Sequence, residues 1–331
     1  MNDFKKKIKI SQIKKEYLDY ILNYFLFKKW LPLYSKSYKI IIKDIWCNAQ
    51  CPMCKDWKYK WNLNEIKKNL YITILKIIKD KSKKKKIYIL WGEPLLIFED
   101  LIKIIKLWTK YNIKFDFPTN ASLLTINKIH QLINAGLDSF TFSIDFPNKK
   151  HDKWRNLKWT YEKIIQFTEY LNKININVQW NIVVWKFNFS EIINFNTLLS
   201  EISPNKINFI NLHDEYEKLD FNKINILWDE ELKEINIIFK NLETIFQSIQ
   251  FNFNWFIKKI NKNKLNTKCY LPLNMSSYLI NDKWITETMC HYHWEVRNKN
   301  KFIYNAINKW CTKCDTTYKY NINKYINDIL L

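Results

Sequence analysis

The sequence predicts an α/β protein built around a parallel sheet, and two observations carry that prediction. Runs rich in β-branched and aromatic residues alternate with amphipathic segments of helical length between residues 38 and 249. Strands that are separated by helices form βαβ units with right-handed crossovers, which place neighbouring strands parallel. The chain of 331 residues, 47% of them hydrophobic, is also long enough to bury a large core. A partly closed barrel and a doubly wound sheet both satisfy the pattern.

The expected elements follow in order along the chain. β-branched and aromatic runs predict strands at 38–45, 87–90, 113–117, 139–144, 177–184 and 206–212. Apolar residues at helical spacing predict helices at 64–79, 98–111, 126–135, 160–173 and 230–249. Lys81–Lys86 is expected to form a solvated loop between the first helix and the second strand. Residues 1–36 are expected to form one or two basic amphipathic helices, and Tyr278–Ile285 a hairpin.

Composition and charge exclude several classes of protein. Aromatic residues make up 17% of the chain, too many for an intrinsically disordered protein. The formal net charge of +22 invites a nucleic-acid interpretation, but the lysines are spread over the whole length without a one-face pattern. We interpret the charge as compositional, because the abundant Lys, Asn, Ile, Tyr and Phe are residues of A/T-rich codons. Nucleic acid is therefore not an expected partner.

The N-terminal region does not resemble a targeting or membrane segment. Met1–Lys15 is too charged for the apolar part of a signal peptide, and the apolar stretch Tyr20–Phe27 is too short to span a bilayer. We expect a cytoplasmic protein with no membrane partner. A reducing compartment disfavours disulfides, so the seven cysteines are expected to serve as metal ligands or catalytic thiolates.

The sharpest motif is a CxxxCxxC cluster formed by Cys47, Cys51 and Cys54. Three soft thiolates on one short loop can each bind one iron of a [4Fe–4S] cluster and leave the fourth iron open, as a reactive cluster requires. The alternatives are a zinc site and plain buried cysteines. Zinc usually has four ligands in paired CxxC spacing, so the iron–sulfur interpretation is favoured.

This cysteine motif resembles the signature of radical S-adenosylmethionine (radical SAM) enzymes, and further motifs follow in the order of that family. They are Trp91–Pro94, similar to GGEP; Pro118–Leu124, similar to a Thr-Asn segment; Ala135–Asp145, similar to GLD…SxD; His151–Thr160, similar to HD..R…G-(Thr/Ser); and Asn181–Asn188, similar to a fifth-strand segment near adenine. The resemblance covers about residues 38–215. Each motif falls at the carboxyl end of a predicted parallel strand, where the βα loops of barrel-type folds form active sites.

The resemblance implies a SAM site and its contacts. The implied SAM contacts are Trp91, Gly92, Glu93, Pro94, Asn120, Ser143, Asp145, Arg155 and Asn181. Glu93 would accept a charge-assisted hydrogen bond from the amino group of SAM, and Ser143 and Asp145 would lie beside its ribose and carboxylate. Taken alone, Ser143 and Asp145 could equally cap a strand end. His151 and Arg155 could equally be solvated loop residues.

Four further cysteines lie near the C-terminus: Cys269, Cys290, Cys311 and Cys314. With the hairpin between the first two, they resemble the SPASM/twitch extension of radical SAM enzymes, which implies one auxiliary [4Fe–4S] cluster; a four-cysteine zinc knuckle is the alternative. The implied organisation is a helical segment at 1–36, a partial (β/α)6 barrel at 37–229, a helical connection at 230–258 and a small α+β cluster-binding domain at 259–331.

The chain holds only two glycines and fifteen tryptophans. Trp91, Trp159 and Trp284 stand where the family has glycine, in places where glycine normally permits a turn or a close backbone approach. One hypothesis is that these tryptophans arise from UGA codons that are translated as Trp but are read as Gly in the organism. The other is true drift in an A/T-rich genome.

Together, these features predict a radical SAM enzyme. By resemblance, it would reductively cleave SAM at a [4Fe–4S] cluster to give a 5′-deoxyadenosyl radical, which would abstract hydrogen from a peptide or protein substrate. A flavodoxin or ferredoxin would supply the electron. The alternatives are an RNA-modifying radical SAM enzyme and a non-catalytic iron–sulfur or zinc protein.

Overall fold

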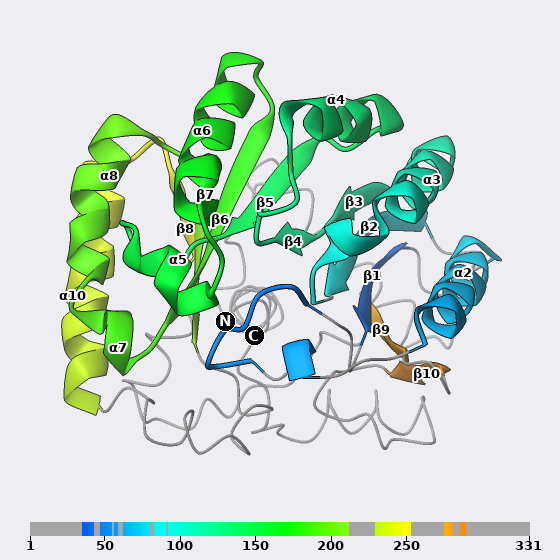
Figure 1. Ribbon diagram of the computed structural model, residues 1–331, viewed down its shortest axis with the longest axis horizontal. Helices are drawn as coiled ribbons and strands as arrows, with labels where there is room; N and C mark the ends of the chain where they lie inside the picture. The colour runs from blue at the N-terminus through cyan, green and yellow to red at the C-terminus, as the bar shows by residue number, and fades with distance from the viewer. Residues whose placement is uncertain are drawn as a thin grey trace, which may run out of the picture.

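The structure is a computed structural model of the chain. It describes residues 35–42, 47–54, 56–58, 62–79, 83–90, 92–211, 229–252, 275–280 and 285–288. Helices lie along the outer side of a curved array of strands (Figure 1). Among these residues no helix combines the length and the apolar character that crossing a membrane requires.

The strands form two five-stranded sheets. The first has the order β10-β9-β1-β2-β3 and consists of β1 (Ser35–Ile42), β2 (Lys83–Leu90), β3 (Lys114–Asp116), β9 (Met275–Ile280) and β10 (Ile285–Thr288). The second has the order β4-β5-β6-β7-β8 and consists of β4 (Pro118–Thr119), β5 (Ser139–Ser143), β6 (Asn177–Val184), β7 (Lys206–Asn211) and β8 (Gln250–Asn252). Every pairing is parallel except the antiparallel β9–β10 pair. Phe117 alone separates β3 from β4, so the two sheets form one curved array (Figure 1).

Helices connect the parallel strands, as the βαβ pattern requires. The α-helices are α2 (Leu63–Lys79), α3 (Phe98–Lys110), α4 (Ile126–Ala135), α5 (Lys150–Arg155), α6 (Thr160–Lys173), α7 (Lys186–Phe189), α8 (Phe195–Glu201) and α10 (Asp229–Ile245), and the 3₁₀ turns are η2 (Asp56–Lys58), η3 (Pro94–Ile97) and η4 (Ile192–Asn194). The α/β prediction is confirmed.

Both ends of α4 are defined by the sequence. The Thr125 hydroxyl accepts a hydrogen bond from the Lys128 N–H at the N-terminus of the helix. At the C-terminus, Gly136 has φ 112°, and a Cβ there would collide with the Thr109 side chain of α3. Only glycine combines that backbone angle with that close helix contact.

The core lies between the strands and the outer helices. Phe142 of β5 and Trp180 of β6 are fully buried, and Trp108 of α3 is buried as well. The indole N–H of Trp180 donates to the Thr168 hydroxyl of α6, 3.1 Å away, so this large side chain is buried without an orphaned donor. These tryptophans are packed core residues.

Several predicted elements are confirmed and some boundaries are wrong. The helices at 126–135 and 160–173 and the strand at 177–184 have the predicted limits. The loop predicted at Lys81–Lys86 is wrong from Lys83 onward, because the four lysines form the first half of β2. Lys83 and Lys84 pair with β1, and Lys86 pairs with Lys114 of β3. Backbone pairing between two neighbouring strands outweighs the low strand preference of lysine. The helix expected at 230–249 ends at Ile245, and the short strand β8 follows it.

The predicted N-terminal and C-terminal segments lie mostly outside the described residues. Residues 1–34 are not described, and Ser35 and Lys36 belong to β1 rather than to a helix. The predicted hairpin is confirmed, since Ile280 of β9 pairs with Ile285 of β10. It joins the barrel sheet, because β9 pairs in parallel with β1. The domain boundaries remain a prediction.

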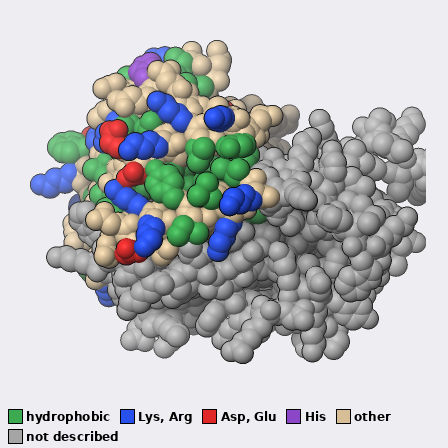
Figure 2. Space-filling view, turned by 90° about the vertical axis from the view of Figure 1, so that its right-hand side faces the viewer, with side chains coloured by type: hydrophobic (Ala, Val, Ile, Leu, Met, Phe, Trp, Pro, Cys, Tyr) green, Lys and Arg blue, Asp and Glu red, His purple; other side chains and the backbone are tan. Residues whose placement is uncertain are grey.

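The surface in Figure 2 bears on the interpretation of the charge. On this face Lys and Arg side chains are interspersed with hydrophobic side chains and a few acidic ones. Surface ion pairs add to this mixture; Lys67 contacts Asp100 at 2.6 Å and Lys114 contacts Asp138 at 2.8 Å. The described part of this face therefore shows no continuous basic surface of the kind that binds nucleic acid.

Candidate active site

The three N-terminal cysteines lie on the loop that follows β1. The Cys54 N–H donates to the Cys51 carbonyl at 3.0 Å, which closes a turn between them. The Ala49 N–H points at the Cys47 sulfur, 3.4 Å away. None of the three forms a disulfide.

The cysteine loop packs against an aromatic cluster. Ala49, Cys51 and Met53 are buried together with Phe146, which follows β5, and Trp185, which follows β6. These aromatic rings cover one side of the loop with apolar surface, while Gln50 and Pro52 on the loop are exposed.

The thiols in this environment fit an iron–sulfur cluster. Burial raises the pKa of Cys47 to about 12, with the Ala49 N–H acting against the rise. Such a thiol keeps its proton at neutral pH unless a metal replaces it. Among the described residues no three His, Cys, Asp or Glu side chains surround one point as the ligands of a single ion do. In a [4Fe–4S] cluster each thiolate binds a different iron, so a three-cysteine loop suits that group.

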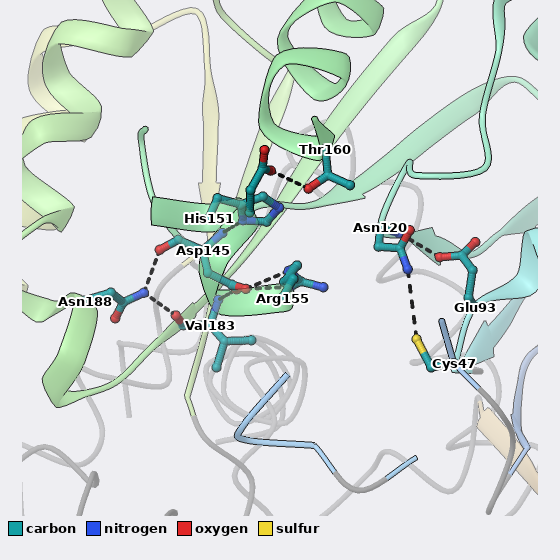
Figure 3. Close-up of polar contacts among 10 residues, drawn as sticks. Cys47, Glu93, Asn120, Asp145, His151, Arg155, Thr160, Val183 and Asn188 are labelled. Carbon is teal, nitrogen blue, oxygen red and sulfur yellow. Dashed lines mark hydrogen bonds and ion pairs between the residues drawn. The ribbon is translucent and has the colours of Figure 1, made fainter. Parts of the chain in front are cut away.

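Glu93 lies at the carboxyl end of β2 and is fully buried. One carboxylate oxygen accepts hydrogen bonds from the Leu95 N–H at 3.0 Å and the Thr119 hydroxyl at 2.8 Å. The other accepts from the Asn120 N–H at 2.8 Å, a contact that Figure 3 shows. Burial raises the pKa of Glu93, and these three hydrogen bonds oppose the rise. Glu93 thus joins the ends of β2 and β4, a role the sequence did not indicate. A carboxylate has about four lone-pair sites, so one remains beyond these three.

Asp145 and Arg155 form a buried ion pair across the end of β5 and α5. The Arg155 Nε and Nη2 atoms lie 2.8 and 2.7 Å from one Asp145 oxygen (Figure 3). Burial raises the pKa of Asp145 and Arg155 opposes the rise. Burial lowers the pKa of Arg155, but the charges of Asp145 and Cys51 outweigh it, so this pKa is raised. The pair is also tied to the cysteine loop, because the Gln50 N–H donates to the Arg155 carbonyl at 2.9 Å.

His151 supports Asp145 from α5. Its Nδ1 accepts a hydrogen bond from the Asp145 N–H at 3.1 Å, so the ring proton of the neutral form lies on Nε2. Burial, helped by the charge of Arg155, lowers the pKa of His151 well below its usual value. The solvated-loop alternative for His151 and Arg155 is therefore wrong, because both side chains are buried.

Asparagines tie the remaining strand ends to this centre. The Asn188 Nδ2 donates to the carbonyls of Asp145 and Val183 at 2.8 and 2.7 Å (Figure 3). Asn181 accepts from Asn208 of β7 at 2.8 Å. The Asn188 contacts tie the segment after β5 to the carboxyl end of β6, and the Asn181–Asn208 contact joins the middle of β6 to β7.

The structure thus gathers some sequence-predicted residues and leaves others undescribed. Cys47, Glu93 and Asn120 lie together, and Asp145 lies with Arg155. Three further residues are placed at strand ends or turns: Gly92 and Ser143 are half-buried, and Pro94 is buried at the start of η3. Outside the described residues are Trp91, Trp284, Cys269, Cys290, Cys311 and Cys314.

Asn48, Gln50 and Ser122 hold the cysteine loop in place, yet sequence reasoning did not single them out. The Asn48 Nδ2 donates to the Ser122 hydroxyl at 2.8 Å, and the Gln50 carbonyl oxygen accepts from Asn156 at 2.6 Å. Asparagine is so common in this chain that its presence beside Cys47 carried no signal.

Trp159 has a conformation that suits glycine. It lies at the start of α6 with φ 65° and ψ 12°, in the left-handed region, and 63% of it is exposed. A bulky residue in that region is an outlier, and here no burial offsets the strain. This geometry supports the hypothesis that glycine belongs at position 159.

We expect Trp159→Gly to raise the free energy of unfolding by about 1 kcal/mol, because the left-handed penalty exceeds the extra entropy that glycine gives the unfolded chain. Urea unfolding of the two proteins measures the difference. As a control, Trp180→Gly should lower the free energy of unfolding by about 3–5 kcal/mol, since it leaves a cavity in the core. A UGG codon at position 159 would refute the UGA hypothesis whatever the stability.

The fold and the site define an α/β protein that carries a three-cysteine loop and buried polar residues at the carboxyl ends of its parallel strands. Proteins of this class form their sites where the βα loops converge. Residues 44–199 match the sequence model of the Radical SAM superfamily.

Individual relatives are similar over different shares of the chain. An AdoMet-dependent heme synthase of Methanosarcina barkeri (strain Fusaro / DSM 804) is 31% identical over 119 residues, which cover 36% of this chain and 34% of that protein. Streptococcus suis SuiB bound to S-adenosylmethionine superposes with a TM-score of 0.62 at 16% identity, over 83% of this chain and 64% of SuiB. The protein anSMEcpe, with bound AdoMet and the Cp18Cys peptide, gives a TM-score of 0.58 at 16% identity, over 82% of this chain and 84% of its own. The chain thus spans about a third of the curated relative, and the structural likeness establishes the fold.

Proposed function

We propose that this protein is a radical SAM enzyme that acts on a peptide or protein. The observation that carries the proposal is the loop of Cys47, Cys51 and Cys54, which packs against an apolar cluster beside buried Asp145 and Arg155. When bound there, a [4Fe–4S] cluster supplies the electron that cleaves SAM to methionine and a 5′-deoxyadenosyl radical, which abstracts a hydrogen atom from the substrate.

The residues of the chain would bind and orient the cluster and SAM and limit the access of water to them. The three cysteines would hold the cluster, while Phe146 and Trp185 cover one side of the loop with apolar surface. The residues proposed to contact SAM are Trp91, Gly92, Glu93, Pro94, Asn120, Ser143, Asp145, Arg155 and Asn181. Within this set Arg155 supplies the buried positive charge that a SAM carboxylate requires, and Asp145 holds its guanidinium in place.

Two structural neighbours support a peptide substrate. SuiB has been solved with the precursor peptide SuiA, and anSMEcpe with the Cp18Cys peptide. Their folds match most of this chain, so a site of similar construction could admit a peptide here. The likeness to the heme synthase covers only 34% of that protein, so heme synthesis is not proposed for this chain.

The remaining proposals concern the C-terminal cysteines, the electron donor and the location of the enzyme in the cell. Cys269, Cys290, Cys311 and Cys314 are proposed to hold an auxiliary [4Fe–4S] cluster in a domain at 259–331. Flavodoxin or ferredoxin would be the electron donor. A reducing compartment keeps seven cysteines available for metal binding, so we place the enzyme in the cytoplasm.

Anaerobic reconstitution tests the proposal. Wild-type protein loaded with iron and sulfide, then given SAM and dithionite, is expected to release 5′-deoxyadenosine, measured by liquid chromatography. Cys51→Ala should reduce that product to the background of the assay, because one iron loses its ligand. As a matched control, Ser200→Ala, which changes an exposed serine of α8, should leave product formation unaltered.

Two outcomes would contradict the proposal. One is wild-type protein that binds iron and sulfide but forms no 5′-deoxyadenosine. The other is a variant without Cys47, Cys51 and Cys54 whose N-terminal iron content equals that of the wild type.

A further inference from the structure

Three side chains form a closed hydrogen-bonded ring beside Cys47. Asn120 donates to the Asn48 carbonyl oxygen at 3.0 Å, Asn48 donates to the Ser122 hydroxyl at 2.8 Å, and Ser122 donates to the Asn120 carbonyl oxygen at 2.6 Å. Each member gives one hydrogen bond to the next in the same sense around the ring. Such a circuit polarises all three bonds together, so it is stronger than three separate contacts.

The backbone fixes the direction of this ring. The Ser122 N–H is an obligatory donor and points at the Asn120 side chain at 2.9 Å, so the Asn120 atom facing it is the carbonyl oxygen. The amide nitrogen of Asn120 must then face Asn48 as a donor, and the Asn48 atom facing it must be the oxygen. The Asn48 nitrogen is left to donate to the Ser122 hydroxyl.

The ring aims one hydrogen at the cysteine loop. The Asn120 amide nitrogen carries two hydrogens, one of which goes to Asn48. The same nitrogen lies 3.9 Å from the Cys47 sulfur (Figure 3). Its second hydrogen is the one available for that contact. The Asn120 main chain is held independently, because its N–H donates to the buried Glu93 carboxylate. The position of Asn120 is therefore fixed by Glu93, and its side-chain orientation by Asn48 and Ser122.

We propose that Asn48 and Ser122 are positioning residues of the iron–sulfur site. By closing the ring they hold the Asn120 amide against the Cys47 sulfur, and this donor slows the loss of iron and raises the reduction potential of the cluster. Hydrogen bonds to ligand sulfurs and the groups that orient first ligands have these two effects in metal sites. This inference rests on the proposed function, since it assumes a cluster at Cys47.

The ring makes a prediction that separate contacts would not make. Opening it at either residue releases the same Asn120 amide, so Asn48→Ala and Ser122→Ala should each speed iron release to a chelator about tenfold. The double variant should be no faster than either single variant, because contacts within one network are not additive. Ser122→Thr keeps the hydroxyl and should restore slow release, and the exposed Ser200→Ala should match the wild type.

The experiment compares reconstituted proteins under anaerobic conditions. Iron release is followed by the absorbance of a ferrous chelator, and the midpoint potential by EPR-monitored redox titration, where both alanine variants should shift to more negative values. Ser122→Thr keeps the test valid should an alanine variant fail to fold, since its predicted behaviour is that of the wild type. A threonine variant that releases iron as fast as the alanine variant contradicts the inference.

A failure of the proposed function can be distinguished from a failure of this inference. Wild-type protein that holds no iron at Cys47, Cys51 and Cys54 overturns the proposed function and this inference with it. Wild-type protein that holds iron, together with alanine variants that release it at the wild-type rate, overturns this inference alone. Effects that add in the double variant also overturn it, because they show two independent contacts.

Discussion

Replacing Arg155 by alanine is expected to lower the free energy of unfolding by about 3–5 kcal/mol. Arg155 places two nitrogen atoms on one oxygen of Asp145, whose side chain is fully buried. Removing the cation leaves a carboxylate without its counter-charge in a low-dielectric interior, which is the costly half of a buried ion pair. Urea unfolding of the unloaded protein measures the loss.

The loss should depend on pH in a defined direction. Burial already raises the pKa of Asp145, and in Arg155→Ala the opposing effect of the guanidinium is absent. The folded state then binds the proton more tightly than the unfolded state, whose Asp pKa is about 3.9. The stability of the variant is retained below the unfolded-state pKa and is lost as pH rises through the folded-state pKa. The variant should therefore lose more unfolding free energy, relative to the wild type, at pH 8 than at pH 5.

A control lies two residues away on the same helix. Lys153 is exposed, so Lys153→Ala should change the free energy of unfolding by no more than about 0.5 kcal/mol. If Arg155→Ala is as stable as this control at pH 8, the buried pair does not carry the energy that we assign to it.

Glu93→Ala is expected to cost at least about 3 kcal/mol of unfolding free energy, because it leaves three donors unsatisfied at about 1–3 kcal/mol each. These donors are the N–H groups of Leu95 and Asn120 and the Thr119 hydroxyl. The site around them is buried, so water replaces the carboxylate poorly. Chemical unfolding, read by tryptophan fluorescence, measures the change.

Glu93→Gln keeps the size of the side chain and changes only its hydrogen bonding, so it separates these two contributions to stability. The glutamine amide keeps one acceptor oxygen, but its NH2 group takes the place of the other and faces the donors of this site. We therefore expect an intermediate loss of about 1–3 kcal/mol of unfolding free energy. Equal stability of the wild type and Glu93→Gln would mean that one of the three hydrogen bonds contributes nothing.

The fold was largely predictable because local signals agreed with the parallel topology. Helix α4 has the predicted limits since Thr125 caps its start and Gly136 ends it. Strand β2 was shortened in the prediction because its first four residues are lysines, and pairing with β1 is a tertiary effect that no local preference shows. Strand β8 was missed because three residues, Gln250–Asn252, are too few for a period to be visible.

The candidate site was predictable only at the level of motifs. The cysteine spacing indicated iron–sulfur chemistry, and the parallel topology indicated that the strand ends would meet. The hydrogen bonds of Glu93 and the ring through Asn48 depend on the directions of side chains from segments far apart in the sequence. Such directions are set by packing, so they could not be derived from spacing alone.

The pairing of β1 with both β2 and β9 has a consequence for the order in which the protein can form. Ser37 pairs with Met275, so one edge of the first barrel strand is completed by a segment that the ribosome makes only after β2 to β8. Contacts of such long range are slow to form, and until then the β1 edge presents unpaired backbone groups to any other strand. Sheet growth on the β2 side can proceed during synthesis, whereas closure at β9 must wait. The nascent chain therefore depends on its own distant hairpin, or on a chaperone, to protect the strand that leads into the cysteine loop.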